Sequence, residues 1–559
     1  MHKAIKILKS PNDYRDYDYS VLSNDMQLII VSDPQTESSV CGVRVEAGSF
    51  HEPASSPGLA HFLEHMLFLG SEKYPNPNQY DQYMTGNGGN NNAWTEDDYT
   101  CYVFEVSNHD RFMEGVDMTL QFFIAPLFKA KYTSKELKAV NSEFETNAAD
   151  DEWRATRILF TNSCPGSLLR NFHLGNAKTL SAKDTREQLI KFWSEYYSSN
   201  LMTVVLYTNK SIEEVKKGCI PILEAVKNKK LPKTRIAPKQ PYPFGKAECQ
   251  KLFLFRSVKD RHNLRVVWFF PNSHNLRVPN ILSYFSCFLS NNVEGSLINT
   301  LVKENLAVSG FCDYVDAADL FSYMQLDINL TAEGMKSLDR VYQCIGGTMQ
   351  LLQRPENRQW YYDELRTMND INFRYEERRD PSTELESIIC DLGYPMNENI
   401  LRGGLYAPFD AELIDEISKY FRLDNMLLLL SSKDIEFTKT HHEEYFDIDY
   451  EKRDLTDEEK KHLLFWDQTK IFFPSKNPFI PDTFECTVPY PLTLPSSLYF
   501  QSGEDYRLVY YLPMFSVPKC VLILTASYPP LIGERAVDLV YMNIWASYIT
   551  QECQEIIDY

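Results

Sequence analysis

The chain has 559 residues, enough for two or three domains, and its 43% hydrophobic and 24% charged residues are the balance of an ordinary globular protein. Its formal net charge of −20 argues against nucleic acid and anionic membrane surfaces as partners. No apolar run is long enough to span a bilayer, and the twelve cysteines are scattered without a Cys-x-x-Cys pair. We therefore expect a cytoplasmic protein with reduced thiols and no membrane span.

Two strands are predicted at residues 27–32 and 40–45, and an apolar helix follows them. The helix carries His61-x-x-Glu64-His65, the inverted form of a zinc-protease motif. Because residues four apart share one helix face, both imidazoles can bind a single metal ion. Glu64 borders that face and can reach a water on the metal without being a ligand. The alternative interpretation is that the two histidines are satisfied core residues.

The start of this helix has its own signals. Ser56 fits the N-cap position and Pro57 the first helical position, and Gly70 fits just past the helix end. Further on, residues 85–92 form a glycine-rich approach to Ala93-Trp94-Thr95, and residues 100–106 alternate as a half-buried strand.

A second relevant helix is predicted over residues 133–146. Thr133 and Glu136 form a candidate capping box at its start. Glu136 and Glu143 are seven residues apart and share one face, whereas Glu145 lies on the opposite side. Two histidines from one helix and a glutamate from a later helix are a known catalytic zinc set. Spacing alone does not decide between Glu136 and Glu143 as the third ligand.

The next segment repeats the first in outline. A strand at 264–270, an apolar helix from Ile281, a helix start at 361–366 and a strand at 425–430 follow in the same order and at similar spacing. This order predicts duplicated domains of about 220 residues. Ser283-Tyr-Phe-Ser-Cys287 stands where the first copy has its metal motif, so we expect only the first copy to bind metal.

We divide the chain into four parts on these grounds. Residues 1–235 form the predicted catalytic zinc-binding domain and residues 236–455 a second, homologous domain without metal. Residues 456–480 are a charged, proline-rich linker, and residues 481–559 are the start of a truncated third domain.

These residues resemble the insulin-degrading enzyme and pitrilysin family of zinc metallopeptidases, the inverzincin type, and are most similar to the N-terminal half of its insulin-degrading enzyme-like branch. The most specific stretches are 58–77, 92–95, 136–143, 172–180 and 474–481. The resemblance implies an α+β fold of tandem repeated α/β-sandwich domains, each a mostly antiparallel sheet with helices packed on it.

The resemblance also implies roles for individual residues. His61, His65 and Glu143 would bind Zn²⁺, Glu64 would be the general base, and Glu136 would support a ligand from behind. Asn92, Ala93 and Trp94 match the sheet edge on which the family binds peptides as an added strand, although a plain edge strand is the alternative. A glycine-rich segment that anchors substrate N-termini in the family matches 290–296, where this chain lacks the histidine-and-glycine pattern.

Family members of this branch have four similar domains in two halves around a chamber, and the second half supplies an Arg and a Tyr that hold the substrate carbonyl. This chain ends roughly 80 residues into the third domain, too few for another copy. We therefore expect a zinc-dependent endopeptidase for peptides, weak without a C-terminal half in the same or a separate chain. The alternative is a weakly active or non-catalytic peptide-binding half or subunit that needs this partner.

A third interpretation is a processing-peptidase subunit, which has two domains and needs a partner. The additional stretch 474–559 argues against this interpretation. The oligomeric state stays open, a homo-oligomer included.

Overall fold

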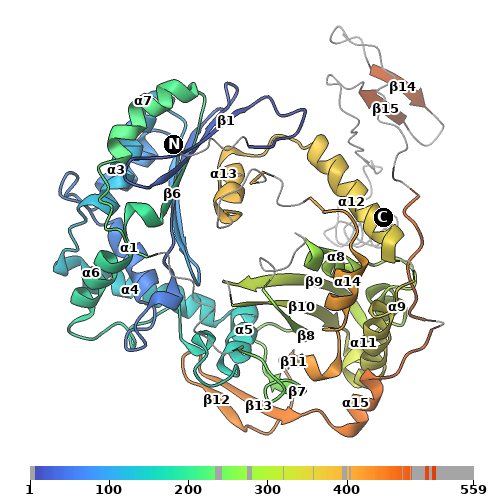
Figure 1. The fold of residues 1–559 in the computed structure, drawn as a ribbon. Helices are drawn as coiled ribbons and strands as arrows, with labels where there is room; N and C mark the ends of the chain where they lie inside the picture. Colours follow the sequence, from blue (N-terminus) through green and yellow to red (C-terminus); the bar gives the residue numbers. More distant parts are fainter. Residues whose placement is uncertain are drawn as a thin grey trace, which may run out of the picture.

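The computed structural model describes residues 7–232, 242–272, 280–392, 400–401 and 405–480, apart from residues 319, 357, 469 and 479, and the backbone of 498–502 and 507–511. Two units, each built on one sheet, lie side by side around an open centre (Figure 1). The predicted α+β class is confirmed by these two largely antiparallel sheets with helices packed on them.

The first unit contains a six-stranded sheet with the order β1-β2-β6-β3-β5-β4. Its strands are antiparallel to their neighbours except β2 and β6, which run parallel. The strands are β1 (Asp16–Val21), β2 (Gln27–Ser32), β3 (Ser39–Val45), β4 (Asn90–Thr95), β5 (Thr100–Val106) and β6 (Met202–Thr208). The helices are α1 (Leu59–Leu67), α2 (Gln79–Gly86), α3 (Phe112–Ile124), α4 (Ala130–Ala148), α5 (Asp151–Thr161), α6 (Thr185–Tyr196) and α7 (Ile212–Leu223).

The second unit contains a seven-stranded sheet with the order β12-β13-β7-β11-β8-β10-β9. The strands are β7 (Lys251–Phe255), β8 (His262–Phe270), β9 (Ala307–Ala317), β10 (Phe321–Leu330), β11 (Met426–Ser432), β12 (His441–Glu443) and β13 (Ile448–Asp454). The helices are α8 (Ile281–Ser290), α9 (Leu297–Lys303), α10 (Ala332–Lys336), α11 (Leu338–Leu352), α12 (Arg358–Arg374), α13 (Pro381–Cys390), α14 (Ala411–Ser418) and α15 (Asp457–Leu463).

Five strands repeat the same topology in the two units. The order β2-β6-β3-β5-β4 of the first sheet matches β7-β11-β8-β10-β9 of the second, and the pairs β2–β6 and β7–β11 are both parallel. In each unit an apolar helix, α1 or α8, stands between the second strand of the repeat and the edge strand. This common arrangement supports the predicted duplication.

The first sheet is covered on both faces because successive residues of a strand point to opposite sides. On β2, Leu28 and Ile30 pack with α1 and α3, whereas Ile29 and Val31 pack with α13. Figure 1 shows α13 on the side of β6 that faces the open centre, with α1, α3 and α7 on the other side. A helix from the predicted second domain therefore closes the core of the first unit.

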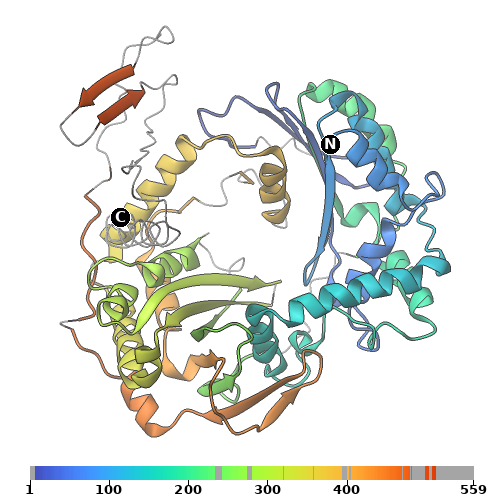
Figure 2. The ribbon, with the colours of Figure 1, turned by 180° about the vertical axis from the view of Figure 1, so that it is seen from behind.

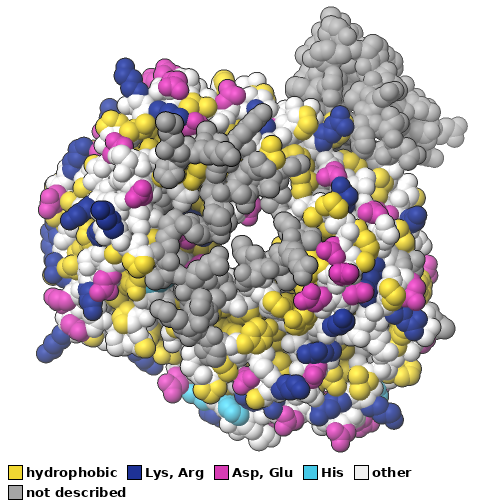
Figure 3. All heavy atoms as spheres, in the orientation of Figure 1, with side chains coloured by type: hydrophobic (Ala, Val, Ile, Leu, Met, Phe, Trp, Pro, Cys, Tyr) yellow, Lys and Arg dark blue, Asp and Glu magenta, His cyan; other side chains and the backbone are white. Residues whose placement is uncertain are grey.

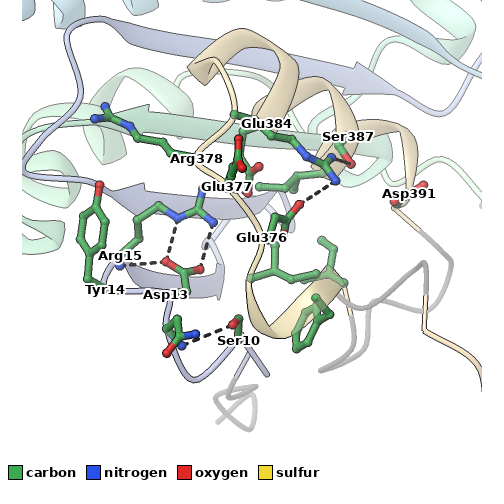
Figure 4. A pocket seen from close by; sticks show the side chains of 16 residues that line it. Ser10, Asp13, Tyr14, Arg15, Glu376, Glu377, Arg378, Glu384, Ser387 and Asp391 are labelled. Atoms are coloured by element: carbon green, nitrogen blue, oxygen red, sulfur yellow. Dashed lines mark hydrogen bonds and ion pairs between the residues drawn. The ribbon is translucent and has the colours of Figure 1, made fainter. Parts of the chain in front are cut away.

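Charged side chains strengthen this seam. Arg15 Nη1 lies 2.9 Å from a carboxylate oxygen of Glu384 on α13, and its Nε and Nη2 donate to Asp13 at 2.8 and 3.0 Å. Figure 4 shows these side chains lining a small pocket. Its volume is about 200 Å³. Because all three groups are largely buried, the two segments are held together where solvent screens the charges little.

A second seam is formed by α5, which lies where the two units meet (Figures 1 and 2). Ile158 and Leu159 of α5 share a buried cluster with Phe253 and Phe269 of the second sheet. Arg157 Nε donates to Glu443 at 2.8 Å, a buried pair that crosses between the units. These contacts hold α5 against the second sheet.

The last predicted domain, residues 481–559, lies outside the described residues except for the backbone of β14 (Leu498–Ser502) and β15 (Arg507–Tyr511), which pair antiparallel. No helix in the described ranges combines the length and the apolar character that a membrane crossing requires. Acidic and basic side chains are interspersed over both units in the view of Figure 3.

Candidate metal centre

The helix α1 begins at a glycine and not at the predicted Ser56. Gly58 is the N-cap, with φ of +87° and no side-chain cap, and its neighbourhood requires glycine because an added Cβ would lie 2.1 Å from Gly175 Cα. The free backbone N–H groups of Gly58 and Ala60 instead donate to the two carboxylate oxygens of Glu52, at 2.7 and 2.8 Å. The N-cap prediction for Ser56 is wrong because the carboxyl group of Glu52, outside the helix, takes the capping role.

The close approach of Gly58 and Gly175 also places a backbone carbonyl at the first histidine. His61 Nδ1 lies 2.8 Å from Leu174 O, and His65 Nδ1 lies 2.9 Å from Glu136 Oε1. With a proton on each Nδ1 donated to these oxygens, the Nε2 lone pairs of both rings are free to bind a metal. The two Nε2 atoms face each other at 3.3 Å.

Glu143 completes the group from α4. Its Oε2 lies 3.6 Å from His61 Nε2 and 3.3 Å from His65 Nε2. Ligand atoms about 2.0–2.2 Å from a tetrahedral zinc ion are separated by about 3.3–3.6 Å, so the three atoms have the spacing of three zinc ligands. Glu143 is 43% exposed, which leaves the outward side of the group accessible.

The other predicted carboxylates on α4 have different positions. The helix starts at Ala130 with Lys129 as its N-cap, so Thr133 and Glu136 do not form the candidate capping box. Glu136 instead contacts His65 on the ring nitrogen remote from Glu143. Glu145 accepts a hydrogen bond from Asn141 at 2.8 Å and takes no part in the cluster.

Glu64 lies beside this group. A carboxylate oxygen of Glu64 and one ring nitrogen each of His61 and His65 all lie within 4.8 Å of one another, a looser spacing than that of Glu143. Thr95 donates its hydroxyl proton to Glu64 Oε2 at 2.6 Å. In the part of the chain that the structure describes, no other set of His, Cys, Asp and Glu side chains is close enough to hold a metal.

The electrostatics of the group follow from its burial and its mutual contacts. Burial raises the pKa of Glu64, against the opposing effect of the neighbouring imidazoles and Thr95. Burial disfavours the charged ring of His65, but hydrogen bonds to Glu136 and Glu143 outweigh it and raise its pKa to about 9. The hydrogen bond to His65 lowers the pKa of Glu143. Without a metal, the cluster thus favours the anionic form of Glu143 and the protonated form of His65, and a metal bound at His65 would displace that proton.

The residues predicted for substrate binding lie on β4, the strand at the edge of the first sheet. Among the described residues β4 pairs with β5 alone, and it contacts α1. Ala93 points to the α1 face, where it packs against the main core of the unit, whereas Trp94 packs on the opposite face with the cluster that α13 joins. Asn92 is exposed.

Three supporting groups escaped the sequence reasoning: Glu52, Thr95 and the carbonyl of Leu174. Leu174 is 113 residues from His61, and Thr95 is 31 residues from Glu64. Only the sheet and helix packing brings such pairs together, so spacing within one helix could not reveal them. Only Thr95 was marked by a local sequence signal, because it comes directly after the predicted substrate-binding residues Asn92, Ala93 and Trp94.

Comparisons with known proteins agree with this geometry. Family models match three consecutive stretches: Insulinase (Peptidase family M16) at residues 27–176, the Peptidase M16 inactive domain at 184–369, and the middle or third domain of peptidase_M16 at 373–559. The chain therefore belongs to peptidase family M16. Its recognition as a member of the insulin-degrading enzyme and pitrilysin group is confirmed.

Individual relatives make the likeness specific. Human insulin-degrading enzyme (Homo sapiens) is 30% identical over 521 residues, which are 90% of this chain and 51% of that protein. Insulin-degrading enzyme-like 1, peroxisomal, of Arabidopsis thaliana is 30% identical over 86% of this chain and 50% of its own length. The crystal structure of pitrilysin superposes with a TM-score of 0.81 at 26% identity, covering 91% of this chain and 54% of pitrilysin. The chain spans about half the length of the curated relatives it matches.

Proposed function

We propose that this chain is a zinc-dependent metalloendopeptidase that hydrolyses peptides. The observation that carries the proposal is the convergence of His61 Nε2, His65 Nε2 and Glu143 Oε2 at the spacing of zinc ligands, with Glu64 beside them. A relative from Schizosaccharomyces pombe is named as a zinc protease, which supports zinc as the metal.

In this proposal each residue has one task. His61, His65 and Glu143 would hold Zn²⁺, which when bound acts as a Lewis acid that acidifies water and polarises a carbonyl oxygen. Glu64 accepts the proton of the attacking water and returns it to the leaving amine. Its burial and its raised pKa suit a group that must both accept and release that proton. Glu136 and the carbonyl of Leu174 orient the imidazoles.

Peptides are the proposed substrates because an exposed strand edge lies next to the metal helix. An extended peptide added to β4 would be held through its backbone, with Asn92, Ala93 and Trp94 as the receiving strand. Such a mode reads shape and backbone more than sequence, which suits a peptidase for varied peptides. A C-terminal half, in the same or a separate chain, is the proposed partner, and the cytoplasm is the proposed compartment.

The test is the variant Glu64→Gln. Glutamine keeps the shape of the side chain and the hydrogen bond to Thr95 but cannot accept the proton, so hydrolysis of a fluorogenic peptide should fall to background while the zinc content stays at one per chain. Zinc content is measured by elemental mass spectrometry. Peptide turnover is measured with and without a chelator. Unchanged hydrolysis in the variant would remove Glu64 as the base, and loss of zinc would make it a ligand or a structural support.

A peptide-binding half with little activity is the second candidate, favoured by the fact that the chain spans only half the length of its relatives. In that case the zinc-loaded chain binds the peptide but turns it over slowly until a C-terminal half is supplied as a separate chain. If adding the C-terminal half does not raise peptide turnover, this second candidate is ruled out and the first proposal remains.

A further inference from the structure

Thr95 is the last residue of β4 and contacts the proposed general base directly. Its hydroxyl donates to Glu64 Oε2 at 2.6 Å, a charge-assisted hydrogen bond of normal length for an O–H donor and a carboxylate. Among the described residues Glu64 accepts no other hydrogen bond, so Oε1 is the oxygen that stays available for a proton. The carboxylate is therefore oriented by a single donor.

That donor sits at a firmly held point of the sheet. Thr95 pairs with Thr100 at the end of the β4–β5 ladder, and Glu96 N donates to Tyr99 O at 2.8 Å to close the turn between the strands. Thr100 is fully buried and its own hydroxyl donates to Ala47 O at 2.8 Å. The turn thus fixes the backbone of Thr95 relative to the sheet, independently of α1.

The direction of the Thr95 side chain follows from the pleat. Ala93 packs on the α1 face and Trp94 on the α13 face, so Thr95 returns to the α1 face. A hydroxyl at this position can reach the helix, whereas a hydroxyl one residue earlier would point away from it. The strand that offers its edge to a peptide therefore also carries the group that holds Glu64.

We infer that Thr95 is a positioning residue that orients the Glu64 carboxylate and couples the peptide-binding edge of β4 to the proposed general base. This inference rests on the proposed function. When a peptide adds to β4 and stiffens it, the position of the Thr95 hydroxyl becomes better defined, and Glu64 is held with Oε1 toward the attacking water.

The experiment compares three variants with the wild-type chain. Thr95→Val keeps the branched shape and removes the donor, Thr95→Ser keeps the donor, and Thr348→Val removes a buried threonine hydroxyl bond in the second unit, to Cys344 O at 2.9 Å. We expect kcat for a fluorogenic peptide to fall about tenfold to a hundredfold in Thr95→Val, with KM and zinc content within twofold of wild type. Thr95→Ser and Thr348→Val should stay within about threefold of wild type.

A crystal structure of Thr95→Val gives a readout that does not depend on turnover. Glu64 should leave its single orientation while His61, His65 and Glu143 keep theirs. The inference is overturned if Glu64 keeps the same orientation, if KM rises with kcat unchanged, or if Thr95→Ser is as slow as Thr95→Val. If the zinc-loaded wild-type chain turns over no peptide, the proposed function fails, and the position of Glu64 in the crystal still decides the role of Thr95.

Discussion

The helices α1 and α8 hold the same place in two copies of one topology, yet only α1 gathers metal-ligating side chains. Each follows the antiparallel strand next to the central parallel pair, β3 or β8, and each precedes an edge strand, β4 or β9. Each also begins at a residue with positive φ, Gly58 or Asn280, that has no side-chain cap. Backbone architecture alone therefore does not make the site.

The difference lies in the side chains on one face and in their partners. In α8 the residues four apart are Ser283 and Cys287, 4.0 Å from each other, and Tyr406 donates to Ser283 at 3.0 Å. On α12, the helix that matches α4, Glu364 accepts from the backbone N–H of Asn477 at 2.9 Å. These side chains of the second unit are satisfied by one another or by the backbone, and α8 has no imidazole at the two positions where α1 offers His61 and His65.

The largest effect is expected from removing the two imidazoles that α1 has and α8 lacks. The double variant His61→Ala with His65→Ala leaves neither a ring nitrogen nor a thiolate on this face, so zinc binding should be lost and peptide turnover should fall at least about a thousandfold. The matched control is Ser283→Ala with Cys287→Ala in α8, which should keep both. Zinc retained in the first variant, or lost in the control, would break the contrast between the two helices.

A smaller effect is expected from the carboxylate behind His65. Glu136→Gln weakens the acceptor for His65 Nδ1, so zinc affinity should fall about tenfold to a hundredfold in competition with a chelator. Glu364→Gln on α12 is the matched control and should leave the affinity unchanged. Equal affinities in wild type and Glu136→Gln would show that Glu136 only borders the site.

The smallest effect concerns Glu52 at the start of α1. Burial raises its pKa from the ordinary 4.5 to about 8, against three backbone N–H donors that lower it. Between about pH 4.5 and 8 the folded state then holds a proton that the unfolded state has released, so stability falls as pH rises through this window, by at most about 1.4 kcal/mol per pH unit.

Glu52→Gln should therefore lose part of the pH dependence of unfolding. Denaturant unfolding between pH 5 and 8 should show the wild type losing stability relative to the variant as pH rises. The opposite result, a free energy of unfolding that rises with pH in the wild type relative to the variant, would contradict this. It would mean that the folded state favours the ionised form of Glu52, stabilised by the helix N-terminus.

Much of the fold could be predicted from the sequence, since local patterns set it. The strands predicted at 27–32 and 100–106 coincide with β2 and β5, and the strand predicted at 264–270 lies within β8. The duplicated order of elements reappears as two sheets of common topology. The predicted domain limits stay predictions, and α13, assigned to the second domain, packs on the first sheet. Its residues Leu385, Ile388 and Ile389 are buried against that sheet, a contact between segments far apart in the sequence that no local pattern specifies.

The candidate site, like the fold, was predictable from the sequence only where its residues are close together in the chain. His61, Glu64 and His65 share one helix, so their proximity followed from helical spacing, whereas Glu143 was separated from Glu136 only by resemblance. The groups that orient them come from elsewhere: Leu174, Glu136, Thr95 and Glu52 reach α1 through tertiary packing. The predicted helix start at Ser56-Pro57 and the predicted capping box of Thr133 and Glu136 are both wrong. In each case the polar side chain that a local pattern assigned to a helix start was replaced in that role or bonded elsewhere in the fold.

The most direct test of the central claim is anomalous diffraction at the zinc edge from crystals of the zinc-loaded chain. The account predicts one peak per chain, about 2.0–2.1 Å from the Nε2 atoms of His61 and His65 and about 2.0–2.2 Å from one oxygen of Glu143. A peak coordinated by Glu136 or Glu64 in place of Glu143, or a peak at α8 in the second unit, would contradict it.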